Sequence, residues 1–342
     1  MSLPPSGEIP QGAIRFNTDS QKLEFYAQGE WWVMSTDTPN LGRSVDSTPG
    51  ARAIWAGGNS STDGDVIEYV NISSTGNGTD FGNLESNKKY PAGTSSSTRG
   101  ISAGGGPASP NGSDVIEFVT IASTGDAQDF GNLVDGNTYI SGLSNQTRGI
   151  YAGGKQSGSF TNEIQYITIA STGNANDFGD LTQTRGNAGG VGSPVRGVFQ
   201  GGYTPTDVNT IDFITVATLG NAQDFGDLTN THGQQGGNQA GSTTRGFFIG
   251  GQPSGETQID YITIASTGNS TAFGESSIAL GYSNCTSDKV RLVRGGGQAG
   301  PGARDSIEYL IISTEGDAVD FGDLTTDKHH SGSCFSNAHG GL

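Results

Sequence analysis

Short apolar runs alternate with polar, glycine-rich stretches along most of the chain. One apolar run, RGIYAGG at 148–154, ends at a glycine pair, and a second, EIQYITIA at 163–170, follows after a polar stretch. The second run places apolar side chains on both alternating faces, with Ile164 on one face and Ile167 on the other. β-Branched and aromatic residues favour strands. A strand that is apolar on both faces is expected to be covered on both.

A turn and two further strands complete the pattern. The segment STGNA at 171–175 supplies turn chemistry, because Gly and Asn tolerate positive φ. DFGDL at 177–181 then returns as a short strand, and the glycine-rich stretch NAGGVGSPV at 187–195 supplies a fourth. The pattern therefore predicts four short antiparallel strands in each unit.

This unit occurs six times. The phenylalanine of the DFG phrase recurs at intervals of 49, 48, 47, 48 and 48 residues, and an arginine followed five and six residues later by two glycines keeps the same period. The phenylalanines are Phe81, Phe130, Phe178, Phe225, Phe273 and Phe321, and the arginines are Arg52, Arg99, Arg148, Arg196, Arg245 and Arg291. Six units of this length predict an all-β fold, a six-bladed β-propeller, because WD40 and kelch blades have this size.

Other repeat architectures fit less well. No unit contains an amphipathic helix, and a parallel β-helix would need much shorter coils. After the sixth DFGDL the chain continues as TTDKHHSGSCFSNAHGGL at 325–342, with His339–Gly340 where the next Arg–Gly pair would stand. We expect this segment to supply the missing first strand of the unit that begins at Arg52. Residues 42–50 would then be a loop or a competing strand.

The glycine pair after an apolar strand, with an aromatic residue in a later strand, resembles the kelch repeat over residues 42–342. Residues 1–41 do not share the repeat, and IPQGAIRFNTDSQKLEFYAQGEWWVMS at 9–35 reads as three short strands. This segment resembles small β modules of phage tail fibres and other virion proteins. The match is carried by Gly12, Arg15, Phe16, Asn17, Thr18, Asp19, Leu23, Glu24, Tyr26, Trp31 and Trp32.

The repeat phrase also resembles phage sequences. Copies such as RGVFQGG at 196–202 and STGNANDFGDL at 171–181 are similar to repeats in structural proteins of marine phages, notably those of cyanobacteria. The two resemblances imply a virion protein assembled in the host cytoplasm, with an attachment module at 1–41 and a propeller at 42–342.

The composition of the chain argues against some classes of binding partner. Seventeen Lys and Arg against 34 Asp and Glu give a formal net charge of −17. Nucleic acid and anionic membranes would repel such a chain. No run approaches the 18 apolar residues of a membrane span, and the start, MSLPPSGEIPQGAIRF, lacks the basic and apolar regions of a secretory signal. We therefore expect neither nucleic-acid binding nor membrane insertion, and the sequence leaves a homo-oligomer open.

The DFG phrase invites comparison with the metal-binding motif of protein kinases. That motif acts with a glycine-rich loop, a strand lysine and an HRD sequence, and the chain has none of these. Its aspartates are interpreted as caps of backbone amides in tight turns, with calcium binding as the alternative. The aspartates are Asp80, Asp129, Asp177, Asp224 and Asp320. No cofactor or metal is otherwise expected.

The repeated arginines, the two cysteines and the histidine pair are interpreted as structural rather than reactive groups. The repeated arginines are expected to pair with DFGD carboxylates, the alternative being a shared face that binds an acidic ligand. Cys285 and Cys334 occupy near-equivalent positions and should lie near each other, although a disulfide is not favoured. His329–His330 is interpreted as a solvated stretch rather than a metal site. G-x-S-x-G, H-E-x-x-H and C-x-x-C motifs are absent, so no enzymatic activity is expected.

Binding is expected where the repeats differ. The polar loops after the glycine pairs vary in sequence, and loops of this kind gather on one rim of a propeller and carry binding residues. Candidate binding residues there are Asn111, Phe160, Tyr203 and Asp207, and candidate attachment residues in the first module are Phe25, Tyr26, Trp31 and Trp32.

The resemblances to phage proteins thus imply a non-enzymatic virion protein with a tail-fibre or adhesin-like role, and we expect the propeller rim to contact a glycan or protein of the host surface. The alternative is a head decoration, knob or tail component whose propeller docks on other virion proteins. In both cases the first module would bind other virion proteins.

Overall fold

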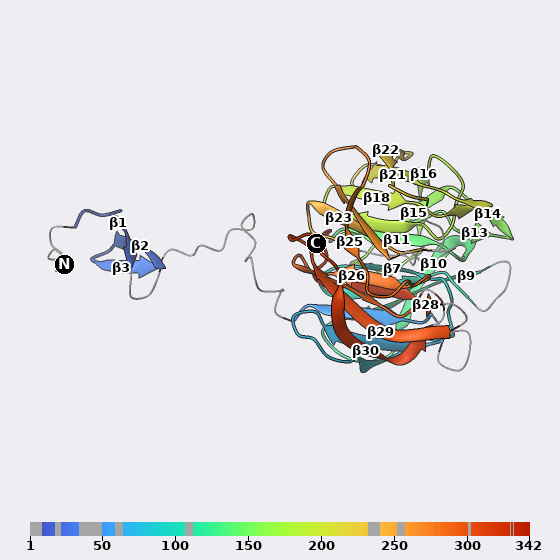
Figure 1. Cartoon of the computed structure of the whole chain (residues 1–342), viewed down its shortest axis with the longest axis horizontal. Helices are drawn as coiled ribbons and strands as arrows, with labels where there is room; N and C mark the ends of the chain where they lie inside the picture. Colours follow the sequence, from blue (N-terminus) through green and yellow to red (C-terminus); the bar gives the residue numbers. More distant parts are fainter. Residues whose placement is uncertain are drawn as a thin grey trace. The chain divides into compact units, whose positions relative to one another are not determined.

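The structure of the chain, a computed structural model, describes residues 9–17, 22–33, 50–58, 64–106, 112–231, 240–251, 257–299, 302–328, 330 and 332–342. The chain divides into two compact units, Met1–Val45 and Asp46–Leu342. Both consist of strands joined by turns, as Figure 1 shows, and the described residues contain no helix. The all-β class predicted from the sequence is therefore confirmed.

The first unit contains a three-stranded antiparallel meander of β1 (Ile14–Asn17), β2 (Lys22–Ala27) and β3 (Glu30–Val33). The two-residue turn between β2 and β3 has φ values of 56° at Gln28 and 85° at Gly29. Positive φ at both central residues matches the twist of a tight hairpin. The turn sets the register, which places Tyr26 opposite Trp31 and Phe25 opposite Trp32.

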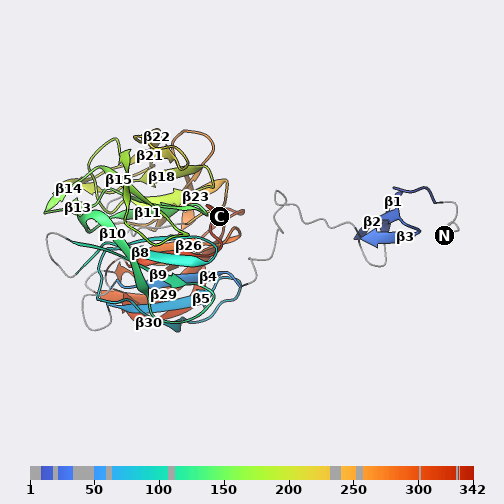
Figure 2. The same ribbon diagram turned by 180° about the vertical axis from the view of Figure 1, so that it is seen from behind.

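The second unit contains six antiparallel sheets, one for each repeat (Figures 1 and 2). We number the sheets one to six after the arginines Arg52 to Arg291. Sheet one is β31 (Ser333–Ser336), β4 (Arg52–Ala56), β5 (Val66–Asn71) and β6 (Thr79–Asn83); sheet two is β7 (Ala92–Ser95), β8 (Arg99–Ala103), β9 (Ser113–Thr120) and β10 (Gln128–Asn137); sheet three is β11 (Ser141–Ser144), β12 (Arg148–Ala152), β15 (Glu163–Thr168) and β16 (Asn176–Asp180).

The other three sheets follow the same order. Sheet four is β17 (Gly189–Gly192), β18 (Arg196–Gln200), β21 (Thr210–Thr215) and β22 (Gln223–Asp227); sheet five is β23 (Arg245–Ile249), β24 (Gln258–Thr263) and β25 (Thr271–Glu275); sheet six is β26 (Asn284–Ser287), β27 (Arg291–Gly295), β29 (Gly302–Ile311) and β30 (Val319–Lys328), with β28 (Gln298–Ala299) paired to β29. Two short hairpins extend from sheets three and four: β13 (Lys155–Gln156) with β14 (Ser159–Phe160), and β19 (Tyr203–Thr204) with β20 (Thr206–Asp207).

The end of the chain completes sheet one, as the repeat predicted. β31 pairs antiparallel with β4, and Phe335 stands opposite Ile54. Beyond β31, the Asn337 Oδ1 accepts a hydrogen bond from the Arg52 backbone N–H at 2.9 Å, as the Ser96 Oγ does from the Arg99 N–H in sheet two. The first strands of neighbouring sheets also lie together: β7 contacts both β31 and β11, and β26 contacts β31. Residues 42–49 lie outside the described residues.

Each repeat stacks an arginine, an aromatic ring and the DFG phenylalanine within one sheet. In sheet one the Arg52 guanidinium lies 4.6 Å from the Tyr69 ring centroid, and the Tyr69 ring meets Phe81 edge-on at 5.8 Å. Phe81 is 2% exposed. Equivalent stacks are Arg99–Phe118–Phe130, Arg148–Tyr166–Phe178, Arg196–Phe213–Phe225, Arg245–Tyr261–Phe273 and Arg291–Tyr309–Phe321.

The predicted ion pair between these arginines and the DFGD carboxylates is wrong. Each arginine Nη1 instead donates to a backbone carbonyl of another sheet, as Arg52 does to Ile121 at 2.7 Å. The other pairs are Arg99 with Ile169, Arg148 with Val216, Arg196 with Ile264, Arg245 with Ile312, and Arg291 with Ile72. Five repeats have an aspartate before this phenylalanine and all five are exposed, while the fifth repeat has Ala272 instead, so the stack on the ring and the carbonyl contact satisfy the arginine without a carboxylate.

The DFG phrase also binds the STGN phrase of the next sheet. The Gly125 N–H donates to the Phe81 carbonyl at 2.7 Å, and the Asp126 Oδ1 accepts from the Asn83 N–H at 2.9 Å. Between sheets six and one, the Gly76 N–H donates to the Phe321 carbonyl and the Asp323 N–H to the Asn77 Oδ1. The capping role expected of the DFG aspartate therefore belongs to the Asn or Asp of the STGN phrase.

The DFG glycine permits this close approach, which leads to a testable prediction. Gly226 has a φ of +147°, and a Cβ there would lie 2.5 Å from the Gly268 carbonyl oxygen. Gly268 has a similar φ of +154°, but no atom lies within 4 Å of a Cβ at that position. Replacing either glycine with alanine should cost about 1–3 kcal/mol of backbone strain. Gly226→Ala should cost about 1–3 kcal/mol more, because the two sheets must separate.

Chemical denaturation of Gly226→Ala and Gly268→Ala would measure the difference between them. Equal losses of unfolding free energy would contradict the role of this contact between sheets.

A second set of contacts between sheets is buried and charged. One polar side chain of each third strand is almost fully buried and accepts a hydrogen bond from a backbone N–H of the preceding sheet. The side chains and their donors are Glu68 with Thr325, Glu117 with Glu85, Gln165 with Val134, Asp212 with Thr182, Asp260 with Thr229, and Glu308 with Ser277. Buried ion pairs join four of the acids to cations: Lys328–Glu68, Lys88–Glu117, Arg185–Asp212 and Arg294–Glu308.

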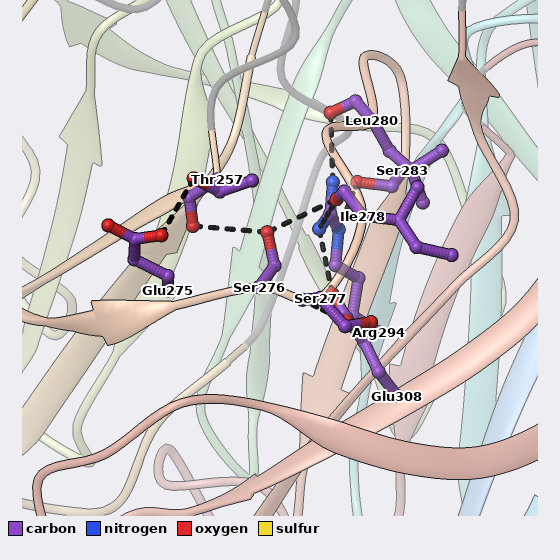
Figure 3. A network of polar contacts seen from close by, with 9 residues as sticks. All are labelled: Thr257, Glu275, Ser276, Ser277, Ile278, Leu280, Ser283, Arg294 and Glu308. Atoms are coloured by element: carbon purple, nitrogen blue, oxygen red, sulfur yellow. Dashed lines mark hydrogen bonds and ion pairs between the residues drawn. The ribbon is translucent and has the colours of Figure 1, made fainter.

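Figure 3 shows the network around Arg294, whose Nη1 lies 2.8 Å from the Glu308 Oε1. Its Nε donates to the Ser283 Oγ at 2.7 Å and its Nη2 to the Leu280 carbonyl at 2.8 Å. Leu280 stands seven residues after the DFG phenylalanine, where three other repeats carry Lys88, Arg185 and Lys328. In sheet six the cation that pairs with the buried Glu308 is therefore Arg294 of β27, because the usual position of the cation is occupied by Leu280.

Candidate functional site

In four sheets, the segment that enters the first strand holds one residue in a left-handed conformation, nine residues after the DFG phenylalanine. Tyr90, Tyr139, Asn187 and Tyr282 have φ values of 55°, 59°, 53° and 56°. The preceding residue is fixed by a bridge to the segment after the glycine pair of the same sheet. These bridges are Lys89 with Gly106, Thr138 with Lys155, Gly186 with Tyr203, and Gly281 with Gln298.

The side chains from this position meet one another. The Tyr90 ring lies 4.2 Å from Tyr139, 5.6 Å from Tyr282 and 5.0 Å from His330, measured between ring centroids. The Tyr90 Oη and the His330 Nδ1 are joined by a hydrogen bond of 2.7 Å. His330 stands nine residues after Phe321 and thus at the equivalent position. We call Tyr90, Tyr139, Tyr282 and His330 the aromatic cluster.

The backbone of this cluster is strained at its three tyrosines. A bulky residue with positive φ is rare, because its Cβ crowds the backbone. Such strain costs of the order of 1–3 kcal/mol per residue and concentrates at binding sites and active sites. Asn187 shows that a residue suited to positive φ fits the same place. Three tyrosines at a position that favours glycine or asparagine therefore indicate a role for their side chains.

The phenols of Tyr90 and Tyr282 have raised pKa values. Burial raises the pKa of Tyr90, and the neighbouring Tyr139 and Tyr282 raise it further. The pKa of Tyr282 is also raised, mainly by burial and then by Tyr139, with the charge of Asp207 acting in the same direction. Tyr90 and Tyr282 therefore offer ring faces and neutral hydroxyl groups rather than phenolate bases.

Three of the predicted rim residues lie beside this cluster. Phe160 on β14 and Tyr203 on β19 meet edge-on, with centroids 5.6 Å apart. Phe160 also adjoins Tyr139, because a Cβ on Gly186 would lie 3.1 Å from the Phe160 ring and 3.2 Å from the Tyr139 Cβ. Asp207 stands opposite Tyr203 in the β19–β20 hairpin. The fourth predicted residue, Asn111, lies outside the described residues.

The cluster and these rim residues form one partly exposed surface. Tyr90, Tyr139, Tyr282 and His330 are all half-buried, as are Phe160 and Tyr203. The Lys155 Nζ lies 5.7 Å from the Phe160 centroid. Rigid aromatic rings with hydroxyl groups at their edges suit ligands that have both apolar faces and hydroxyl groups, such as sugars. The cluster was missed in the sequence, where only its aromatic residues at one place in the repeat could have indicated it.

The candidate attachment residues divide between two faces of the first unit. Tyr26 is 4% exposed and its ring lies 5.3 Å from Trp31. Arg15 lies over the Trp31 ring at 4.1 Å and pairs with Glu24 at 2.8 Å. On the opposite face Phe25 stands between Ile14 and Trp32 in the register, and Ile14, Phe16 and Trp32 are 62%, 59% and 50% exposed. One face is thus internally packed and the other is apolar and exposed.

The other candidate groups offer no reactive site in the described part of the chain. Those ranges contain no group of three or more His, Cys, Asp or Glu residues that could hold a metal ion. His329 is outside them. Cys285 and Cys334 are buried free thiols. Burial raises the pKa of both, that of Cys285 to about 12, and Cys285 raises that of Cys334 further, in agreement with the expected proximity.

No helix among the described residues is long and apolar enough to cross a membrane. The chain matches no protein-family model and no curated protein.

Proposed function

We propose that the chain is a non-enzymatic binding protein built on a closed, six-bladed, kelch-like β-propeller. Three kinds of contact link each sheet to the next, and in each kind sheet six is linked back to sheet one. The Arg291 Nη1 donates to the Ile72 carbonyl, the Gly76 N–H to the Phe321 carbonyl, and the Thr325 N–H to the Glu68 Oε2. A cyclic order of contacts supports a ring, which leaves no sheet with an uncovered face.

The aromatic cluster carries the proposed binding role. It joins residues from four sheets around one point, at a cost in backbone strain that packing alone does not require. We propose that the surface of the cluster with Phe160, Tyr203 and Asp207 binds a glycan of the host surface. Stacking on the rings and hydrogen bonds to the hydroxyl groups would provide the recognition.

We further propose that the chain is an adhesin-like component of a phage virion. The resemblance of residues 9–35 and of the repeat phrase to phage structural proteins supports this role. The exposed apolar face of Ile14, Phe16 and Trp32 suits attachment to another virion protein. The alternative is a structural component in which the same cluster docks on a virion protein instead of a host glycan.

The test replaces strained tyrosines with the residue found at the equivalent place in another repeat. Tyr139→Asn and Tyr282→Asn copy Asn187 and should fold, because relief of about 1–3 kcal/mol of strain offsets the lost packing. Binding of the whole protein to purified host-surface polysaccharides, measured by biolayer interferometry, should weaken about tenfold or more, as for other aromatic anchors. Leu219→Ser, at a residue that is 53% exposed and lies in the turn between β21 and β22, should bind as the wild type does.

Two outcomes would contradict this function. Binding that is unchanged in Tyr139→Asn and Tyr282→Asn would exclude the cluster as the glycan site. Binding to purified virion proteins, without binding to any host polysaccharide, would favour the structural alternative.

A further inference from the structure

A cavity lies at the end of β4 that is remote from the aromatic cluster, where the two ends of the propeller sequence meet. It has a volume of about 560 Å³, within the range of small-molecule sites. Its lining includes Arg52, Tyr69, Asn71, Asn77 and Asn337. The aromatic cluster adjoins the glycine pair at the opposite end of β4, so the two places are separated by the length of the strand. We call this the seam cavity.

The seam cavity differs from its counterparts because the chain is interrupted there. Equivalent grooves at 118–128 and 213–223 have volumes of about 230 and 320 Å³. In those repeats a continuous turn leads into the arginine strand, for example from Ser96 to Arg99. At the seam the same turn is made of two separate segments, with Asn337 from the end of the chain and Gly50 from the start of the propeller, and both line the cavity.

The lining is rich in hydrogen-bond donors. The Arg52 Nη1 is held by the Ile121 carbonyl at 2.7 Å, whereas its Nε and Nη2 have no partner among the described residues. The guanidinium rests on the Tyr69 ring, which fixes its position. Among the described residues that line the cavity, Arg52 is the only charged one and none is a carboxylate. An anion in the cavity would therefore meet a positive group and no adjacent negative one.

Three asparagines add donors of known orientation. The Asn71 Oδ1 accepts from the Ser73 Oγ at 2.7 Å, the Asn77 Oδ1 from the Asp323 N–H at 3.2 Å, and the Asn337 Oδ1 from the Arg52 N–H at 2.9 Å. Each carbonyl oxygen already accepts a hydrogen bond from the protein, which orients the amide, and the NH2 group of each amide can donate to a ligand. A cavity with one guanidinium and three free amide donors favours a carboxylate ligand.

We propose that the seam cavity binds a small carboxylate-bearing ligand of sugar size, such as a uronic acid. The guanidinium of Arg52 pairs with the carboxylate, and the amide NH2 groups donate to the carboxylate and to ring hydroxyl groups. This site is independent of the glycan binding proposed for the aromatic cluster, since it uses residues at the opposite end of the strand.

The test places a carboxylate in the cavity without changing the fold. Asn77→Asp copies Asp126 and Asp317, whose Oδ1 atoms cap backbone N–H groups at 2.9 and 3.0 Å in the equivalent turns. The cap should therefore survive, while the new charge repels an anion. Isothermal titration of the whole protein with glucuronate should show binding that Asn77→Asp weakens about tenfold or more, since juxtaposed like charges are costly. Glucose should bind more weakly than glucuronate.

Asn221→Asp is the matched control, because Asn221 caps the Asp180 N–H in the groove at 213–223. It should bind glucuronate as the wild type does. The proposal is overturned if the wild type does not bind glucuronate, if glucose binds equally well, or if Asn77→Asp and Asn221→Asp bind it equally. Binding to the aromatic cluster should remain unchanged in Asn77→Asp, so loss of one site is distinguishable from loss of the other.

Discussion

Removing residues 332–342 should prevent the second unit from folding. The deletion takes away β31, whose four residues are buried, including Phe335 at 1% exposure. Loss of one large apolar side chain from a core costs about 3–5 kcal/mol, and most domains have only about 5–15 kcal/mol in total. The deletion also exposes the edge of β4 and breaks the turn that caps Arg52. Circular dichroism and thermal unfolding should show no cooperative transition.

A rearranged chain provides the control. Moving residues 332–337 to a place between residues 49 and 50 would put Asn337 three residues before Arg52, the spacing of Ser96 and Arg99 in sheet two. Sheet one would then be continuous like the others, and the rearranged protein should unfold cooperatively. If the rearranged protein also shows no cooperative unfolding, residues 338–342 have an essential role in folding. Cooperative unfolding of the truncated protein would contradict the role of β31 in completing the fold.

Replacing Arg185 should have the next largest effect. Arg185 and Asp212 have side chains that are 0% exposed and lie 3.0 Å apart. The Arg185 Nη1 also donates to the Thr210 carbonyl, and burial lowers the Arg185 pKa while Asp212 raises it. Arg185→Asn would leave the Asp212 carboxylate buried without its cation, which should cost about 3–5 kcal/mol.

A neighbouring repeat provides the rescue. Asn137 and Gln165 occupy in sheets two and three the places that Arg185 and Asp212 occupy in sheets three and four. Both are buried and neutral, and the Gln165 Oε1 accepts the Val134 N–H as the Asp212 Oδ2 accepts the Thr182 N–H. The double variant Arg185→Asn with Asp212→Gln should therefore be more stable than either single variant. Urea denaturation of all four proteins would test this, and additive losses would argue against coupling of the pair.

Most of the elements were predictable because the repeat shows the same local pattern six times. Strands appear where β-branched and aromatic residues are, and turns where glycine and asparagine occur. The pairing of β31 with β4 was also predictable, because only that unit lacked a first strand. The arginines were misassigned, since a cation beside an acidic phrase suggests an ion pair. Each arginine actually contacts an aromatic ring and a backbone carbonyl of another sheet. A carbonyl partner cannot be predicted from sequence, because every residue has one.

The candidate site was predicted only in part. Phe160, Tyr203 and Asp207 were chosen from variable loops, and the structure places them beside one another and the aromatic cluster. The cluster itself was missed, because its members stand in stretches that show no strand pattern. In the first unit, alternation along β2 and β3 separates Phe25 and Trp32 from Tyr26 and Trp31, which a list of aromatic residues does not reveal.

By itself the sequence determined the repeat, the order of strands within each sheet and the turns between them, because these depend on residues close together in the chain. Only the tertiary structure decided which side chains from different repeats meet. Tyr90 and His330 are 240 residues apart yet share a hydrogen bond, and Arg52 and Asn337 meet across 285 residues. Such contacts depend on how the sheets are packed side by side, so no local pattern of residues encodes them.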